Sequence, residues 1–361
     1  MTISRTPRPT QRPTPRWAAL ALAALGLLAA PAAQAAKTVT VKDMGELGTG
    51  LGSFAQAINN NGRTVGTAMS PVDFQHRQVA WQGLKISEFD NCCAGFLPTL
   101  RSINLGGEVV GDHFATRDDS LPVYWTAAGV ASYLPGLSAN GFGYANAINN
   151  AGKIAGAALD ASSDTHAVIW DRTNSVQDLG FLGEPDPGYR HFTMARGINN
   201  LNQVVGDGLV GSARHAFLWQ NGSYTDLGLG TATHINDQGL IAGYAPGFIP
   251  VTWKDGVRKN LPALGGGSTA YGHRVNGINN QGDLVGHAPG TGIGLTKVAV
   301  LWRGGKVIKL GNFPGGTTSD ATGINDKGQI VGSGNLVDGG PHHALRWTVK
   351  GGKVSVAVDH P

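Results

Sequence analysis

The chain contains very little cysteine: Cys92 and Cys93 are its two cysteines in 361 residues, and they are adjacent. A framework of several disulfides is therefore excluded, and a hydrophobic core must stabilise the fold, for which the chain is long enough. A disulfide between neighbouring cysteines would bring their Cα atoms closer than the usual range of about 4.4–6.8 Å and would be strained. Two alternatives stay open, a strained redox-active or rigid-loop disulfide and a pair of unbridged thiols.

Charged residues are also scarce, at 14% of the chain, against about a quarter in an average protein. The first 35 residues carry four Arg, at positions 5, 8, 12 and 16, and no acidic residue. Without them the number of Lys and Arg falls from 28 to 24 and equals the 24 Asp and Glu, so the remaining chain is formally neutral. No basic surface is left that would indicate nucleic acid or an anionic membrane as the partner.

The N-terminal segment is typical of a secretory signal peptide. Its arginines precede an apolar run at 17–30 and the small-x-small sequence Ala33-Gln34-Ala35. A retained membrane anchor is the alternative, but this run is shorter than the roughly 20 residues that span a bilayer. We predict a signal peptide at 1–35, export to the periplasm or the medium, and no membrane span after cleavage.

Short motifs of known catalytic and metal sites are missing. The sequence has no Gly-x-Ser-x-Gly, no His-Glu-x-x-His, no Gly-x-x-x-x-Gly-Lys and no carboxylates at the spacing of a calcium loop. His342 and His343 are adjacent, and neighbours on a strand point to opposite faces, which disfavours a shared metal ion. We predict no metal site and no cofactor.

Glycine is abundant, with 55 residues, and it recurs at fixed positions of a repeated segment. The pattern is Ile-Asn, two mostly small or polar residues, a turn residue and a short apolar run ending in Gly, as at 278–286. Successive copies start 37 to 50 residues apart, which indicates a repeat architecture. The seven copies start at Ile58, Ile103, Ile148, Ile198, Ile235, Ile278 and Ile324.

Each copy is predicted to form a hairpin turn. Its Asn can bond its own backbone in an Asx-turn, and its fifth position is Gly in six copies and Asn202 in the other. Gly and Asn both tolerate the positive φ that a bulged type I turn needs. The seven Asn could ring one face of the molecule, but turn formation already explains them, so we assign them a structural role. They are Asn59, Asn104, Asn149, Asn199, Asn236, Asn279 and Asn325.

A second recurring element is an apolar run that ends in Trp, once in each repeat. A Trp at this spacing is most simply a core residue packed between neighbouring repeats, because its side chain buries roughly 150–250 Å². A sugar-stacking platform is the alternative, and it needs an exposed ring. The residues are Trp81, Trp125, Trp170, Trp219, Trp253, Trp302 and Trp347.

The repeats predict an all-β fold. Each contains four short strands, which end at Ile-Asn, at Gly, at Trp and near a segment such as the Asp-Leu-Gly at 226–228, and no stretch shows sustained helical periodicity. Four strands in about 45 residues are the size of a propeller blade. We predict a monomeric, single-domain, seven-bladed β-propeller of four-stranded blades over 36–361. A strand at 38–44 should join the last blade, or pair beside 353–358, and close the ring.

These motifs resemble a known family. Ile-Asn-Asn-x-Gly-x-x-Val-Gly, the His-Ala-Phe-Leu-Trp at 215–219 and the Asp-Leu-Gly at 226–228 are similar to the HAF-repeat family of exported bacterial proteins. The resemblance covers nearly the whole mature chain and implies an extracellular repeat protein without assigned chemistry. His166 and His343 begin near copies of the triplet, where we expect a structural hydrogen bond. Some members end in an apolar sorting signal, and because 359–361 shows none, we expect no surface anchoring by that route.

Loops that vary between repeats are the predicted recognition surface, because rigid scaffolds usually bind through such loops. In a propeller the connections after the second and fourth strands emerge on one face, and the segments 112–121 and 184–191 carry charged and aromatic residues there. We predict that this face binds an extracellular protein or glycan. The candidate residues are His113, Arg117, Asp118, Asp186, Tyr189, Arg190 and His191. The alternative is an extracellular hydrolase or lyase that draws its acid and base from His113, Asp118, Asp186 and His191.

Overall fold

The computed structural model describes residues 38–89, 98–114, 120–173, 175–265, 272–290, 296–350 and 355–358. These residues contain twenty-nine β-strands, all within one compact unit, 36–361. Among them there is no helix with the length and apolar character needed to cross a membrane. The predicted signal peptide, 1–35, and the two cysteines, Cys92 and Cys93, lie outside the described residues.

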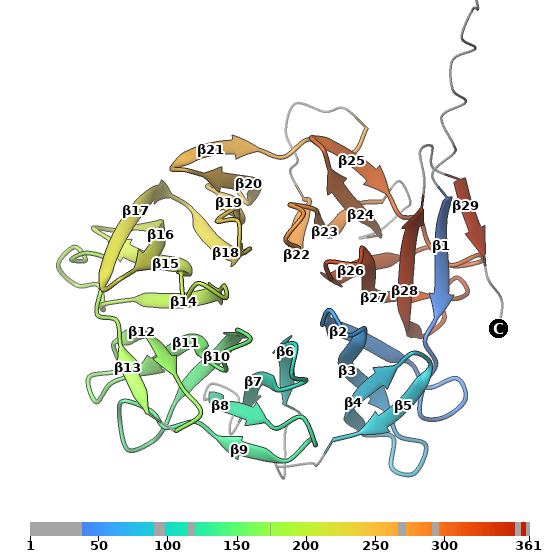
Figure 1. The fold of residues 1–361 in the computed structure, drawn as a ribbon, viewed down its shortest axis with the longest axis horizontal. Helices are drawn as coiled ribbons and strands as arrows, with labels where there is room; N and C mark the ends of the chain where they lie inside the picture. The colour runs from blue at the N-terminus through green and yellow to red at the C-terminus, as the bar shows by residue number, and fades with distance from the viewer. Residues whose placement is uncertain are drawn as a thin grey trace, which may run out of the picture. The chain divides into compact units, whose positions relative to one another are not determined.

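The strands form seven sheets around a central axis, which confirms the predicted all-β, seven-bladed propeller (Figure 1). In every blade four strands follow one another from the axis outward, and we call them a, b, c and d. The a strands are β2 (Ser53–Ile58), β6 (Thr99–Ile103), β10 (Gly143–Ile148), β14 (Thr193–Ile198), β18 (Thr231–Ile235), β22 (Arg274–Ile278) and β26 (Ser319–Ile324). The b strands are β3 (Arg63–Met69), β7 (Val109–Phe114), β11 (Ile154–Leu159), β15 (Val204–Val210), β19 (Ile241–Ala245), β23 (Leu284–Pro289) and β27 (Gln329–Asn335).

The outer half of each blade consists of the c and d strands. The c strands are β4 (His76–Gln82), β8 (Ser120–Trp125), β12 (Thr165–Trp170), β16 (Ala213–Gln220), β20 (Ile249–Lys254), β24 (Lys297–Arg303) and β28 (His342–Lys350). The d strands of blades 1 to 6 are β5 (Lys85–Glu88), β9 (Ala131–Tyr133), β13 (Val176–Asp178), β17 (Ser223–Leu229), β21 (Val257–Asn260) and β25 (Lys306–Lys309). In blade 7 the d position belongs to β1 (Thr38–Asp43), and β29 (Ser355–Val358) lies outside it.

The Ile-Asn segments form the turns between strands a and b. In blade 1, the N–H of Gly62 donates to the carbonyl of Asn59 at 3.0 Å, and Asn59 Oδ1 accepts the N–H of Asn61 and of Arg63, each at 3.0 Å. Gly62 has a φ of 78°, and Asn202, at the same position in blade 4, has a φ of 59°. The bulged turn with a left-handed fifth residue is therefore confirmed.

A β-bulge in every a strand explains the Gly that ends each apolar run. In blade 5 the register shifts between Ala232, which pairs with Gly243, and His234, so Thr233 is the extra residue. A Cβ on Gly243 would lie 2.0 Å from the backbone oxygen of Thr231. The corresponding distance is 1.8–2.0 Å in all seven blades, so a side chain cannot be accommodated at this position.

One hydrophobic cluster fills each interface between neighbouring blades. At the interface of blades 7 and 1, Trp81 packs with Ile58 of its own blade and with Val331 and Ala344 of blade 7. All seven repeat Trp side chains are buried, with exposed fractions of 9% or less. Their rings fill the space between blades, and none of these seven rings is available as a sugar-stacking surface.

The two ends of the described chain close the ring. Strand β1 pairs antiparallel with β28, with Thr38 opposite Lys350 and Asp43 opposite Leu345. Strand β29 pairs parallel with the other edge of β1 (Figure 1). Both predicted partners of the N-terminal strand are therefore found, and the buried Val41 packs in the same cluster as Trp347 of the last blade.

Candidate functional site

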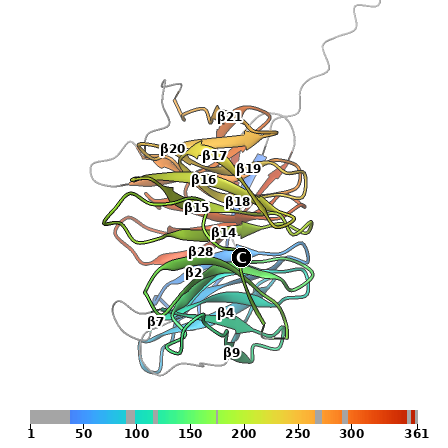
Figure 2. The same cartoon turned by 90° about the vertical axis from the view of Figure 1, so that its left-hand side faces the viewer.

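The strands run between two faces of the ring, which Figure 2 shows from the side. We call the face with the a–b and c–d turns the turn face, and the face with the b–c and d–a connections the loop face. The turn face carries the Ile-Asn segments, and the loop face carries the segments predicted to bind a partner. On the turn face the polar side chains bond to neighbouring blades, whereas on the loop face the predicted binding residues lie in or beside the connections between strands.

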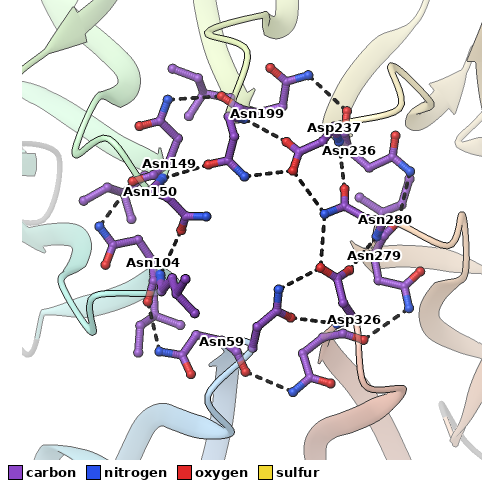
Figure 3. A pocket seen from close by; sticks show the side chains of 18 of the residues that line it. Asn59, Asn104, Asn149, Asn150, Asn199, Asn236, Asp237, Asn279, Asn280 and Asp326 are labelled. Carbon is purple, nitrogen blue, oxygen red and sulfur yellow. Dashed lines mark hydrogen bonds between the residues drawn. The ribbon is translucent and has the colours of Figure 1, made fainter.

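A recess opens on the axis at the turn face (Figure 3). It is lined by the Ile, the Asn and the following residue of all seven repeats and holds about 170 Å³ of space for water-sized molecules. Each repeat Asn donates from its Nδ2 to the backbone carbonyl of the repeat Asn in the next blade, at 2.9–3.2 Å. The last of these bonds runs from Asn325 to Asn59, so seven hydrogen bonds form a closed circle.

The residues that follow the repeat Asn form a second polar arc in this recess. Asn280 donates to the carboxylates of Asp237 and Asp326, each at 3.1 Å. Asn200 donates to the same oxygen of Asp237 at 2.8 Å, and Asn60 donates to that of Asp326 at 2.7 Å. The other oxygen of each carboxylate accepts a backbone N–H from the preceding blade, at 2.8 and 2.7 Å. These polar groups therefore hold neighbouring blades together.

On the loop face, His113 of blade 2 is not in the loop where the sequence placed it. His113 lies in strand β7 and is 5% exposed, with its Nδ1 3.2 Å from the Tyr133 hydroxyl. The strand continues three residues past Gly111, because β7 stays paired with β8 as far as Ser120. His113 is thus a buried strand residue and not part of an exposed loop, and Arg117 and Asp118 lie outside the described residues.

The other four candidates, Asp186, Tyr189, Arg190 and His191, lie together on the d–a connection between blades 3 and 4. The backbone N–H of Asp186 donates to the carbonyl of Gly211 at 3.2 Å, and the Arg190 guanidinium donates to the carbonyl of Ser162. The connection is therefore attached to the b–c loops of both blades. The Tyr189 side chain is 55% exposed.

His191 has two carboxylate partners in this segment. Its Nε2 lies 3.1 Å from Glu184 and its Nδ1 3.4 Å from Asp164, and its ring stacks on Phe181 with 4.5 Å between centroids. The bond to Glu184 is the main cause that raises the pKa of His191 above its usual value, and Asp164 acts in the same direction. Glu184 and Asp164 thus favour the protonated imidazole.

Other His–Asp pairs recur at equivalent positions in the blades. The Nδ1 of His166 lies 2.9 Å from Asp178, and that of His215 lies 2.8 Å from Asp226. Asp178 Oδ1 also accepts the N–H of Gly180 at 2.8 Å. The His of the HAF-type triplet and the Asp of Asp-Leu-Gly therefore connect strands c and d, so both residues have a structural role.

The sequence reasoning missed the exposed aromatic residues of the b–c loops. Phe74 in blade 1 and Phe248 in blade 5 are 64% and 69% exposed. Both have a positive φ, 56° and 57°, which is unusual for a bulky side chain. An aromatic residue inside a short Pro-containing turn, as in Pro246-Gly247-Phe248, is the signal that could have identified them.

Comparison with known proteins supports the fold alone. No family model and no curated protein matches this chain, so the resemblance to the HAF-repeat family stays a prediction. Among solved structures, the chain is similar to a puromycin hydrolase S511A mutant complexed with PGG, with 13% identity and a TM-score of 0.56, over 82% of this chain and 52% of that one. It is also similar to virginiamycin B lyase from Staphylococcus aureus, with 10% identity and a TM-score of 0.52, over 86% and 99% of the two chains. The chain thus spans about half the length of the first protein.

Proposed function

We propose that this chain is an exported binding or scaffold module whose loop face holds an extracellular protein or glycan. The observation that carries the proposal is the position of the exposed aromatic side chains. Of the four in the described residues, Phe74, Tyr189 and Phe248 lie in loop-face connections, and Tyr133 lies at the loop-face end of β9. Aromatic residues on one face of a rigid scaffold are typical of a recognition surface.

Two further features support the loop face as the binding surface. The left-handed backbone of Phe74 and of Phe248 costs about 1–3 kcal/mol each, and such strain is retained mostly where a side chain must be presented in a particular way. The exposed aromatic residues also belong to different blades, which suits an extended partner better than a small molecule. On the turn face, by contrast, the polar groups of the axial recess bond to neighbouring blades.

The alternative, a hydrolase or lyase, has less support. Of the residues proposed as acid and base, His113 is buried in blade 2, while Asp186 and His191 lie between blades 3 and 4. His–Asp pairs also occur at equivalent positions in several blades, and a catalytic pair would be expected in one place. We therefore expect the ligand to be released unchanged after binding.

The proposal is tested by screening the mature chain, 36–361, against a glycan array and a panel of purified extracellular proteins. We expect a partner whose affinity falls at least tenfold in Phe74→Ala, Tyr189→Ala or Phe248→Ala. The matched controls are Leu84→Ala and Leu201→Ala, which remove exposed apolar side chains from the turn face. The proposal is wrong if the turn-face variants lose binding and the loop-face variants keep it, or if the bound partner is cleaved.

A further inference from the structure

A groove of about 730 Å³ lies on the loop face between blades 4 and 5. The start of β16, the end of β17, the start of β18 and the b–c loop of blade 5 line it, together with Arg274 at the start of β22. Three of its side chains are cationic, Arg196, Arg214 and Arg274, and no acidic residue is among those that line it. We propose that this groove binds the carboxylate groups of an acidic oligosaccharide, a chain of uronic acids.

A buried carboxylate orients two of the three arginines. Asp207 is 0% exposed, and one of its oxygens pairs with Arg196 while the other lies 2.5 Å from Arg214 Nη1. The guanidinium of Arg214 also stacks over the ring of Phe192, 4.2 Å from its centroid. Each guanidinium has five N–H donors and uses only some of them on Asp207. The remaining donors are held in place before a ligand arrives, which lowers the entropy lost on binding.

The third arginine is free to pair with a ligand. Arg274 is exposed, its guanidinium carbon lies 6.0 Å from the centroid of the Phe248 ring, and it has no carboxylate partner within the described ranges. Asp207 balances one of the three positive charges, so the groove keeps a formal charge of +2. Guanidinium forks match the geometry of carboxylates, and this charge is complementary to an anion.

The apolar part of the groove favours a sugar over other anions. Phe248 and Leu229 are 69% and 46% exposed and line the groove together with Pro246, so they offer a platform for the C–H face of a pyranose ring. Nucleic acid is disfavoured as a ligand because the chain without the predicted signal peptide, 1–35, is formally neutral and has no extended basic surface. An acidic peptide would lack the ring face that this platform suits.

This proposal names a ligand class for the loop face, and it rests on the proposed binding function. The experiment titrates the mature chain with tetragalacturonate and with its methyl ester in a calorimeter, at low and at high salt. We expect the acid to bind at least tenfold more tightly than the ester, with an affinity that falls as the salt concentration rises. Arg274→Gln should lower the affinity for the acid about tenfold, and Phe248→Ala should lower the affinity for both the acid and the ester.

Lys306→Gln is the matched control, because it removes one exposed positive charge from the turn-face end of β25 in blade 6. Arg214→Gln leaves Asp207 partly unpaired and can therefore destabilise the protein. Weaker binding of the acid by this variant supports the proposal only if its melting temperature equals that of the wild type. The inference is wrong if the acid and the ester bind equally tightly, or if neither binds. It is also wrong if Arg274→Gln binds the acid as tightly as the wild type does, or if an acidic peptide of equal charge binds more tightly than the acid. The proposed function survives these outcomes if another partner still depends on Phe74 or Tyr189.

Discussion

The carboxylate of Asp43 lies 3.2 Å from the imidazole of His343, across the pair of strands that closes the ring. Burial acts to raise the pKa of Asp43, but the bond to His343 and the backbone N–H of Gly45 outweigh it and hold that pKa below its usual value. The same bond raises the pKa of His343. The interaction connects the first described strand to the last blade, so its charge state bears on ring closure.

We expect this contact to stabilise the protein within a limited pH window. A raised His pKa contributes stability below the unfolded value, about 6.5, and the contribution is lost as the pH rises through the folded pKa. A lowered Asp pKa contributes above about 3.9 and is lost as the pH falls through the folded pKa. His343→Gln should therefore lower the free energy of unfolding by about 1.5 kcal/mol at pH 5 and by less at pH 8.5, as measured by urea unfolding.

The control for this prediction is His215→Gln, which removes a similar contact inside blade 4. Amide exchange of β1 should become faster at pH 5 in His343→Gln and stay unchanged in His215→Gln. An equal loss of stability at both pH values in His343→Gln would contradict the role given to the charged pair.

The circle of Asn side chains should contribute to stability at every blade interface. Asn236 is 5% exposed, accepts the N–H of Gln238 at 3.1 Å and of Leu240 at 2.8 Å, and donates to Asn279 at 2.9 Å. Asn236→Ala removes three hydrogen bonds and takes the side-chain acceptor from the backbone N–H groups of Gln238 and Leu240, so the free energy of unfolding should fall by about 2–4 kcal/mol. Asn150→Ala, which removes one exposed bond, should cost less than about 1 kcal/mol. Urea unfolding of both variants checks this, and equal losses would contradict it.

The Gly that faces each bulge should tolerate no side chain. In Gly243→Ala the new methyl group would lie 2.0 Å from the backbone oxygen of Thr231, so strands a and b of blade 5 must separate. We expect a loss of more than about 3 kcal/mol in the free energy of unfolding. Gly106→Ala is the control, because its nearest contact is Asn104 Oδ1 at 3.3 Å and its φ is not positive. A melting temperature for Gly243→Ala equal to that of the control would show that the bulge can relax.

The fold was largely predictable because its determinants recur. Seven copies of the Ile-Asn turn and of the Trp run predict seven blades, and the replacement of Gly by Asn202 in one copy identifies a backbone requirement. The bulge was not foreseen, because the extra residue has no sequence preference of its own: it is Thr233 in blade 5 and Arg196 in blade 4. His113 was misplaced because the length of a b strand depends on its pairing with strand c.

The candidate site was less predictable, because it is formed between repeats. Arg196 and Arg214 come from two strands of blade 4 and Arg274 comes from blade 6, and each looks in the sequence like an ordinary polar residue of a strand. The segment with Tyr189 and Arg190 was identifiable, because it is a long insertion between two repeats. Sequence alone therefore indicates insertions, and the structure is needed to find a groove formed by residues distant in the chain.

We expect β1, and not β29, to be the terminal strand that closes the ring. Strand β1 pairs with β28 on one edge and with β29 on the other, so removal of 351–361 leaves all six pairs between β1 and β28 in place. We expect the truncated chain to keep a free energy of unfolding within about 1 kcal/mol of the full chain. Val41→Asp, by contrast, places a charge beside Trp347 in a fully buried cluster and should cost more than about 3 kcal/mol. Urea unfolding and amide exchange of β28 distinguish the two variants, and a truncation as damaging as Val41→Asp would show that β29 is needed to hold β1 in the last blade.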